Sequence, residues 1–277
     1  MALEDMLNLE EKLQVADIGA AYIAEVPPYK PLLDLGLGHL NAFDADERQH
    51  QKLKEVYGDT ISLYSDILGD GEIQTLHLAS PASGMTSLLK PSEEHLAFFN
   101  GFTRFGEILE TQDVNTNKLD DVECLPCLDF LKMDIQGSEL QVLNSGKRIL
   151  KDCVAIHLEV SFVPLYQDQP CFGEIDTWMR SQGYLPHAFI DIKRWSIYPT
   201  IRNGNFRVPF NQLLEADILY IKDPLNLQSL SNESIKKLAL IAHYSYRSPD
   251  LVVYLLKWLQ EIESVESNCY QQYLSIL

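Results

Sequence analysis

The chain has 277 residues, and 40 Asp and Glu against 22 Lys and Arg give it a formal net charge of −18 at pH 7. This excess of negative charge repels phosphate backbones and anionic lipid, so we expect no nucleic-acid partner. No uncharged apolar stretch approaches the roughly 18 residues that cross a bilayer, and residues 1–12 lack the pattern of a signal peptide. We therefore expect no membrane insertion and a cytoplasmic protein.

The cysteines and histidines point to neither a disulfide framework nor a metal site. Five cysteines are an odd number in a chain too large to need cross-links, which favours free thiols in a reducing compartment. Cys124 and Cys127 have the spacing of a redox motif, but they precede a predicted strand instead of opening a helix, so a chance pair is the better interpretation. No histidines have ligand spacing, and we expect no bound metal.

Apolar spacing and turn residues predict the elements of the first half of the chain. A short helix precedes a strand over 13–18, and prolines make 26–31 a loop. The pattern then predicts a short helical stretch at 32–35, strands at 39–43 and 61–66, a helix at 46–56, and a hairpin turn at 69–71 leading into a strand at 73–79. No period is sustained from 81 to 118, so we expect a long functional loop, whose aromatic run at 98–102 either closes over a substrate or is anchored by apolar contacts.

The second half alternates strands and helices. We predict strands at 128–134, 153–160, 185–192 and 216–221, helices at 138–145, 172–182, 231–245 and 249–266, and an inserted hairpin or loop at 195–209. This alternation predicts a doubly wound α/β fold with a mostly parallel sheet, helices on both faces, and ligands beyond the carboxyl ends of the strands. Residues 1–222 would form this domain, and 223–277 a C-terminal helical extension packed on it. Apolar residues of the last helix also leave a homo-oligomer open.

Two predicted strands end in residues suited to a nucleoside. Asp17 and Gly19 close the first strand, where a glycine permits a tight turn and close approach of a ligand. Asp44 closes the second, and a carboxylate there can accept both hydroxyls of a ribose. The full Gly-x-Gly-x-x-Gly fingerprint is missing, so an adenosine that carries a cationic group fits better than a dinucleotide.

A second group of ionisable residues lies on the strands at 128–134 and 153–160. Lys132 and Asp134 point to one face of the first strand, and His157 and Glu159 have the same spacing on the next. If the strands are neighbours, the four groups converge, and such coupled clusters are where pKa values shift for proton transfer. The alternative is an ion-pair network in which Lys132 ties Glu159 to its neighbour.

These residues resemble the FkbM-type S-adenosylmethionine-dependent methyltransferases. The resemblance covers roughly residues 13–222 and rests mainly on the Lys-x-Asp-x-x-Gly-x-Glu stretch that begins at Lys132, with the later Glu159-Val160 and Leu165-Tyr166. It implies a class I methyltransferase sheet of seven strands, six parallel and one antiparallel. It also implies S-adenosylmethionine as cofactor and O-methylation of a hydroxyl on a glycan, polyketide or other small molecule.

The resemblance also implies roles for single residues. Around the cofactor, Asp17, Gly19 and Ala20 would line the methionine part, Asp44 would hold the ribose, and Asp66 with Ile67 would lie at the adenine. Asp134 would lie by the transferring methyl group and leads as general base, with Glu159 and His157 as further candidates and Lys132 able to stabilise an alkoxide. His157 lies deeper and would only orient Glu159.

The sequence departs from the family pattern in three places, and two other functions compete. Ala21-Tyr22-Ile23 stands where many relatives have Asn-x-Gly, Asp44-Ala45 where many have Glu-Pro, and Gln136 where many have Glu. Asp44-x-Asp46 would suit the metal and nucleotide-sugar site of a glycosyltransferase, although an acidic helix start explains it equally. A non-catalytic protein that binds the cofactor is the remaining alternative.

Overall fold

The computed structural model describes residues 2–20, 26–80 and 82–277. Its central sheet has seven strands in the order β3-β2-β1-β6-β7-β9-β8. These strands are β1 (Leu13–Ile18), β2 (Gly38–Phe43), β3 (Ile61–Tyr64), β6 (Phe130–Met133), β7 (Ala155–Ser161), β8 (Tyr184–Arg194) and β9 (Leu213–Lys222). β9 runs antiparallel to both neighbours, and the other paired strands are parallel. The sequence prediction of six parallel strands and one antiparallel strand is thus confirmed.

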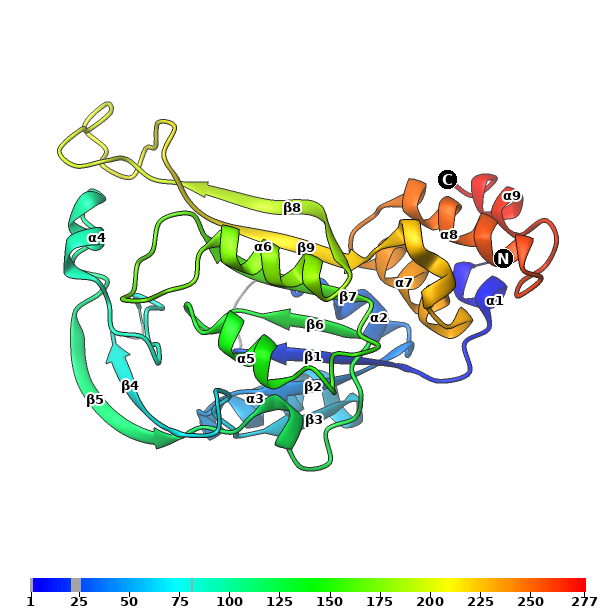
Figure 1. Ribbon diagram of the computed structural model, residues 1–277, viewed down its shortest axis with the longest axis horizontal. Helices are drawn as coiled ribbons and strands as arrows, with labels where there is room; N and C mark the ends of the chain where they lie inside the picture. The colour runs from blue at the N-terminus through cyan, green and yellow to red at the C-terminus, as the bar shows by residue number, and fades with distance from the viewer. Residues whose placement is uncertain (1, 21–25, 81) are drawn as a thin grey trace.

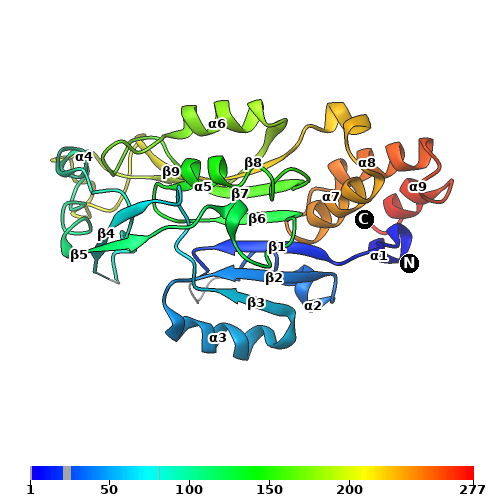
Figure 2. The same ribbon diagram turned by 60° about the horizontal axis from the view of Figure 1, so that its bottom comes forward.

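Helices cover both faces of this sheet (Figure 2). On one face, apolar residues of α5 (Glu139–Ser145) and α6 (Phe172–Ser181) share a core with Leu131 and Leu158. On the other, α7 (Asn232–Tyr244), α8 (Pro249–Glu261) and Leu53 of α3 (Glu47–Tyr57) share a core with Val15 and Phe130. Because β6 alternates, Leu131 and Met133 enter the first core, and Lys132 is left on the opposite face.

The C-terminal helices lie at the end of the molecule opposite the carboxyl ends of β1, β6 and β7 (Figure 1). They share this end with the first helix, and Lys237 of α7 forms an ion pair of 2.9 Å with Asp129, just before β6. One continuous apolar core joins α7 and α8 to the sheet. The boundary between residues 222 and 223 therefore stays a prediction. The remaining helices are α1 (Leu3–Leu7), α2 (Lys30–Asp34), α4 (Glu93–Phe98) and α9 (Cys269–Leu274), with 3₁₀ turns η1 (Gly58–Thr60), η2 (Leu119–Asp121) and η3 (Pro224–Ser229).

The region from 81 to 118 differs from the prediction. It contains α4 and a strand, β5 (Ile108–Asn115), which pairs antiparallel with β4 (Ile73–Ala79) in a separate two-stranded sheet. The predicted strand at 73–79 is confirmed as β4, but it pairs with β5 and not with the preceding strand, so the predicted hairpin and the unbroken loop were wrong. Most of β5 is exposed on both faces, so its sequence carries no alternation of apolar and polar residues that would reveal a strand. The predicted helix at 249–266 was also too long, since α8 ends at Glu261.

Two negative expectations can be compared with the described part of the chain. All five cysteines are free thiols, as expected. None of the helices in the described ranges combines the length and the apolar character needed to span a bilayer.

Candidate functional site

The carboxyl ends of β1, β2 and β6 meet at one level of the sheet. Ile18 pairs with Phe43 on one side and with Met133 on the other, and the amides of Gly19 and Ala20 both donate to the carbonyl oxygen of Phe43, at 3.2 and 3.0 Å. Gly19 has φ +86°, and a Cβ atom there would lie 2.2 Å from the carbonyl oxygen of Asp134. Only glycine allows the two strand ends to approach this closely.

Asp17 is buried beneath this turn and already has two partners. Its carboxylate accepts a hydrogen bond from the Tyr29 hydroxyl at 2.6 Å and binds the Lys132 ammonium at 3.2 Å. Burial and the adjacent Asp17 charge raise the pKa of Tyr29. Burial opposes the charge of Lys132, but Asp17 and Asp134 together raise the pKa of this lysine. The alternative in which Lys132 ties Glu159 to its neighbour was therefore wrong, because the ammonium binds Asp17 of β1.

Asp44 and Asp66 follow β2 and β3 at the same edge. The Asp44 carboxylate accepts from the amide of Asp46 at 2.8 Å, and burial raises its pKa. Asp66 and Ile67 line an open pocket of about 530 Å³ together with residues of β5, and the Asn117 amide donates to the Asp66 carboxylate. The candidate cofactor residues thus follow three adjacent strands in order. The departure at residues 21–23 lies outside the described residues.

The turn after β6 is held by a buried carboxylate that sequence reasoning did not assign. Gln136 and Gly137 have φ +59° and +105°, and the Glu139 side chain accepts from the amides of Ile135 and Gly137 at 3.1 and 3.2 Å. Burial raises the pKa of Glu139 to about 7. The last Glu of the Lys-x-Asp-x-x-Gly-x-Glu stretch therefore fixes the backbone that presents Asp134.

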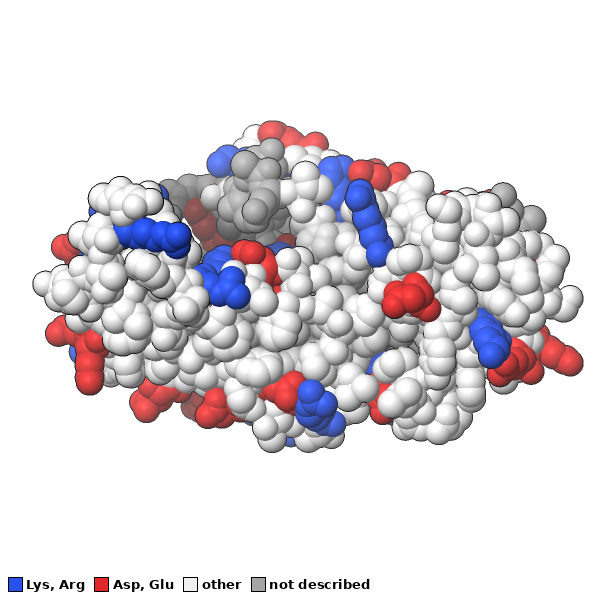
Figure 3. Space-filling model, turned by 90° about the horizontal axis from the view of Figure 1, so that it is seen from above, with Lys and Arg blue, Asp and Glu red and all other residues white. Residues whose placement is uncertain are grey.

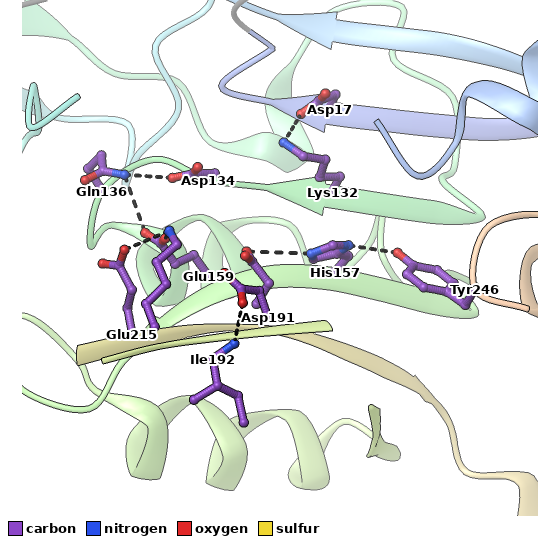
Figure 4. Close-up of polar contacts among 12 residues, drawn as sticks. Asp17, Lys132, Asp134, Gln136, His157, Glu159, Asp191, Ile192, Glu215 and Tyr246 are labelled. Atoms are coloured by element: carbon purple, nitrogen blue, oxygen red, sulfur yellow. Dashed lines mark hydrogen bonds and ion pairs between the residues drawn. The ribbon is translucent and has the colours of Figure 1, made fainter. Parts of the chain in front are cut away.

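Gln136 bridges two carboxylates from neighbouring strands (Figure 4). Its Nε2 donates to Asp134 at 2.9 Å and lies 3.5 Å from Glu159, while its Oε1 accepts from the Tyr166 hydroxyl at 3.0 Å. Tyr166 thereby orients the amide so that its NH₂ group faces the carboxylates. Asp134 and Glu159 converge as the spacing predicted, because Lys132 on β6 pairs in parallel register with His157 on β7.

Glu159 lies among charges supplied by the last two strands. Lys193 of β8 contacts Glu159 at 3.0 Å and Glu215 of β9 at 2.8 Å. Burial, Asp134 and Glu215 raise the pKa of Glu159 to about 9, although Lys193 acts against this shift. Burial and the neighbouring carboxylates thus favour the protonated form of Glu159, and Lys193 favours the charged form. Lys193 and Glu215 were missed in the sequence, because they are brought to Glu159 only by the pairing of β7, β9 and β8.

His157 has partners other than Glu159. Its Nδ1 is hydrogen-bonded to the Tyr246 hydroxyl at 2.9 Å, and its Nε2 lies 3.7 Å from Asp217 of β9. Burial opposes ionisation of Asp217, but the bond and charge of His157 and the nearby lysines lower its pKa. The expectation that His157 orients Glu159 was wrong. The imidazole instead joins Tyr246, in the turn between α7 and α8, to Asp217 of β9 (Figure 4).

Comparison with known proteins identifies the family of the chain. A family model described as the methyltransferase FkbM domain matches residues 17–186, which include Asp17, Asp134 and Glu159. The chain belongs to the FkbM methyltransferase family. This methyltransferase uses S-adenosylmethionine, the cofactor of its family, and the family assignment replaces the glycosyltransferase interpretation of Asp44-x-Asp46. Within the described residues, no group of three His, Cys, Asp or Glu side chains is arranged to hold a metal ion.

The chain has only remote similarity to solved structures. Magnesium protoporphyrin IX methyltransferase from Synechocystis PCC 6803, with bound S-adenosylmethionine, is 11% identical over 77% of this chain and 71% of its own, with a TM-score of 0.38. An uncharacterised protein from Listeria monocytogenes is 12% identical over 99% and 92%, with a TM-score of 0.39. A putative methyltransferase from Thermoplasma acidophilum is 10% identical over 78% and 70%, with a TM-score of 0.34. No curated protein matches the chain significantly.

Proposed function

We propose that this methyltransferase transfers the methyl group of S-adenosylmethionine to a hydroxyl oxygen of a glycan, polyketide or other small molecule. The observation that supports O-methylation is the pair of carboxylates, Asp134 and Glu159, at the carboxyl ends of adjacent strands beside Gly19. A hydroxyl is a weak nucleophile and needs a base at the point of transfer. In the step, the acceptor oxygen forms a bond to the methyl carbon, the carbon–sulfur bond breaks, and the hydroxyl proton passes to a carboxylate.

The residues present suit the cofactor in their chemistry. When bound, S-adenosylmethionine supplies an electrophilic methyl group on a cationic sulfur. Asp44 offers a half-buried carboxylate for the ribose hydroxyls, and Asp66 with Ile67 lines the polar pocket at the end of β3, where we place the adenine. Gly19 and Ala20 would border the methionine part. Asp17 is only 4% exposed, so it would contribute to the methionine site through its pairs with Tyr29 and Lys132.

We assign the general base to Asp134 and not to Glu159. Burial, Asp134 and Glu215 raise the pKa of Glu159 to about 9, which makes its carboxyl group a poorer base at neutral pH than an ordinary carboxylate. Asp134 is half-buried, follows β6 directly, and approaches Gly19 through its own carbonyl. Gln136 holds the carboxyl groups of Asp134 and Glu159 in place. Behind them, His157 positions Asp217, and Lys132 positions Asp17. Alignment of the acceptor and exclusion of water would supply much of the remaining rate.

Labelled S-adenosylmethionine, incubated with the enzyme and cell extracts, should give a labelled product whose mass identifies the acceptor. Asp134→Asn is then measured in single-turnover reactions, with cofactor affinity measured in parallel. Loss of a general base lowers the rate about a hundred- to ten-thousand-fold. A rate within about threefold of the wild-type rate would reject Asp134 as base. Cofactor binding without transfer to any acceptor would instead support a non-catalytic protein.

A further inference from the structure

Two segments far apart in sequence form one surface beyond the carboxyl ends of the strands, and we call residues 98–105 and 194–212 together the platform. The Asn100 side chain, buried at 4% exposure, donates to the Ser196 hydroxyl and to the carbonyl oxygens of Ile197 and Thr200 at 2.9, 3.2 and 2.6 Å. The Trp195 indole donates back to the Asn100 carbonyl oxygen at 2.9 Å. The aromatic run at 98–102 is therefore anchored, and the platform is a built surface.

The platform has the opposite charge to the rest of the protein. It contains four of the eight arginines of the chain, Arg104, Arg194, Arg202 and Arg207, and no Asp or Glu, in a protein of net charge −18. On the face shown in Figure 3, blue side chains lie on largely uncharged surface toward the end that carries the segment between β8 and β9, whereas many red side chains follow the lower rim. A local excess of positive charge raises the concentration of anions at that surface.

The four arginines of the platform are exposed, and no acidic side chain among the described residues neutralises their charge. All four are exposed, and in the described part of the chain none forms an ion pair with Asp or Glu. Arg104 and Arg207 both lie against the ring of Phe206, at 5.2 and 5.8 Å from its centre. Arg202 lies 5.5 Å from the ring centre of Phe210. Stacking on rings orients a guanidinium and leaves its N–H groups free for carboxylate or phosphate oxygens.

A pocket next to these arginines offers room for the body of the ligand. It has a volume of about 350 Å³ and is lined by Trp195, Ile197, Thr200, Phe210, Asn211 and Gln212. Phe210 is also the ring beneath Arg202, so an anionic group and a ring held in the pocket would be neighbours. Lys193 contacts Glu159 at 3.0 Å, and the platform begins at the next residue of the chain, Arg194, so it adjoins the carboxylate cluster.

We propose that the platform binds the acceptor through an anionic group, a carboxylate, phosphate or sulfate, carried by a ring-containing molecule. The arginines bind the anion by paired hydrogen bonds, and the aromatic and amide side chains hold the ring. This inference rests on the proposed function, because it places the acceptor hydroxyl toward Asp134 and Glu159. It narrows the acceptor from any hydroxyl compound to an anionic one.

The test compares probes with and without an anionic group. 4-Nitrophenyl β-D-glucuronide and 4-nitrophenyl β-D-glucoside differ in one carboxylate, and 4-nitrophenyl phosphate separates phosphate from carboxylate recognition. Calorimetry at low salt should show at least fivefold tighter binding of the glucuronide or the phosphate than of the glucoside. The variant Arg202→Glu/Arg207→Glu should abolish this preference. Arg180→Ala, which removes an exposed arginine on α6, should keep it. All three proteins are also titrated with S-adenosylmethionine.

The outcomes separate the platform from the proposed function. Equal affinity for charged and neutral probes, or a preference that survives in the double variant, would overturn the inference. So would an effect of the double variant on binding to vesicles of anionic phospholipid but not on the soluble probes. Unchanged cofactor affinity with a lost probe preference would locate the defect in the platform. A wild-type protein that binds no S-adenosylmethionine would count against the proposed function alone.

Discussion

Gly19 and Asp134 approach so closely that a Cβ atom on Gly19 would lie 2.2 Å from the Asp134 carbonyl oxygen. The two residues directly follow neighbouring strands, and only the absence of a side chain on Gly19 allows its turn to lie this close to the proposed base. Gly19→Ala must either move the turn or distort the end of β6. We expect a loss of about 2–4 kcal/mol in the free energy of unfolding, measured by urea denaturation, together with loss of cofactor binding.

Gly36→Ala is the matched control for this prediction. Gly36 also has positive φ, +71°, but an added Cβ would meet nothing within 4 Å. Its substitution therefore reports the backbone strain alone, about 1 kcal/mol. Equal losses at Gly19 and Gly36 would show that the contact with Asp134 is unimportant.

Asp44→Asn should weaken cofactor binding and leave the fold intact. The Asp44 carboxylate, at the end of β2, accepts a hydrogen bond from the backbone amide of Asp46. We place the ribose hydroxyls on its other oxygen. Replacing a charged acceptor costs about 1.5–3 kcal/mol, or roughly ten- to a hundredfold in the dissociation constant. Calorimetry with S-adenosylmethionine measures the loss, with the exposed Asp59→Asn as control. Unchanged affinity would remove Asp44 from the ribose.

Glu159→Gln should alter how stability depends on pH. The pKa of Glu159 is about 9 in the folded protein and near 4.5 in the unfolded chain, so between these values the folded state alone keeps the proton. Stability must then fall as pH rises, by up to about 1.4 kcal/mol per pH unit. Glu139, with a pKa of about 7, contributes to this pH dependence of stability only below about pH 7. The slope between pH 7 and 9 should therefore flatten in the variant. A slope identical to that of the wild type would contradict the assigned proton.

Tyr246→Phe tests whether the C-terminal helices belong to the site. The substitution leaves Nδ1 of the buried His157 without its partner, which costs about 1–3 kcal/mol in the free energy of unfolding. It should also change the tautomer of His157, observable by NMR of the imidazole nitrogens. Tyr254→Phe, at a residue 45% exposed on α8, is the control and should do neither. An unaltered His157 spectrum in Tyr246→Phe would show that the helices only cover the sheet.

The sequence reveals the sheet and half of the site, for reasons visible in single residues. β6 and β7 are buried runs flanked by turn residues, so their positions and the convergence of Asp134 with Glu159 follow from spacing alone. The partners of Asp134 and Glu159 cannot be predicted from spacing. Lys193, Glu215 and Asp217 meet Glu159 and His157 only because β9 enters antiparallel between β7 and β8, an arrangement that no local pattern in these strands encodes. β5 was missed because its exposed residues have no period.

The central claim, that Asp134 lies beside the transferring methyl group, can be tested without knowing the acceptor. S-adenosylmethionine carries a positive sulfonium, whereas its product S-adenosylhomocysteine is neutral at sulfur. Calorimetry should therefore show that Asp134→Asn weakens S-adenosylmethionine roughly fivefold more than S-adenosylhomocysteine, the effect of about 1 kcal/mol between nearby unit charges. The exposed Asp152→Asn should leave the ratio of the two dissociation constants unchanged. An unchanged ratio in Asp134→Asn would contradict the account, because no carboxylate at residue 134 would then face the sulfonium.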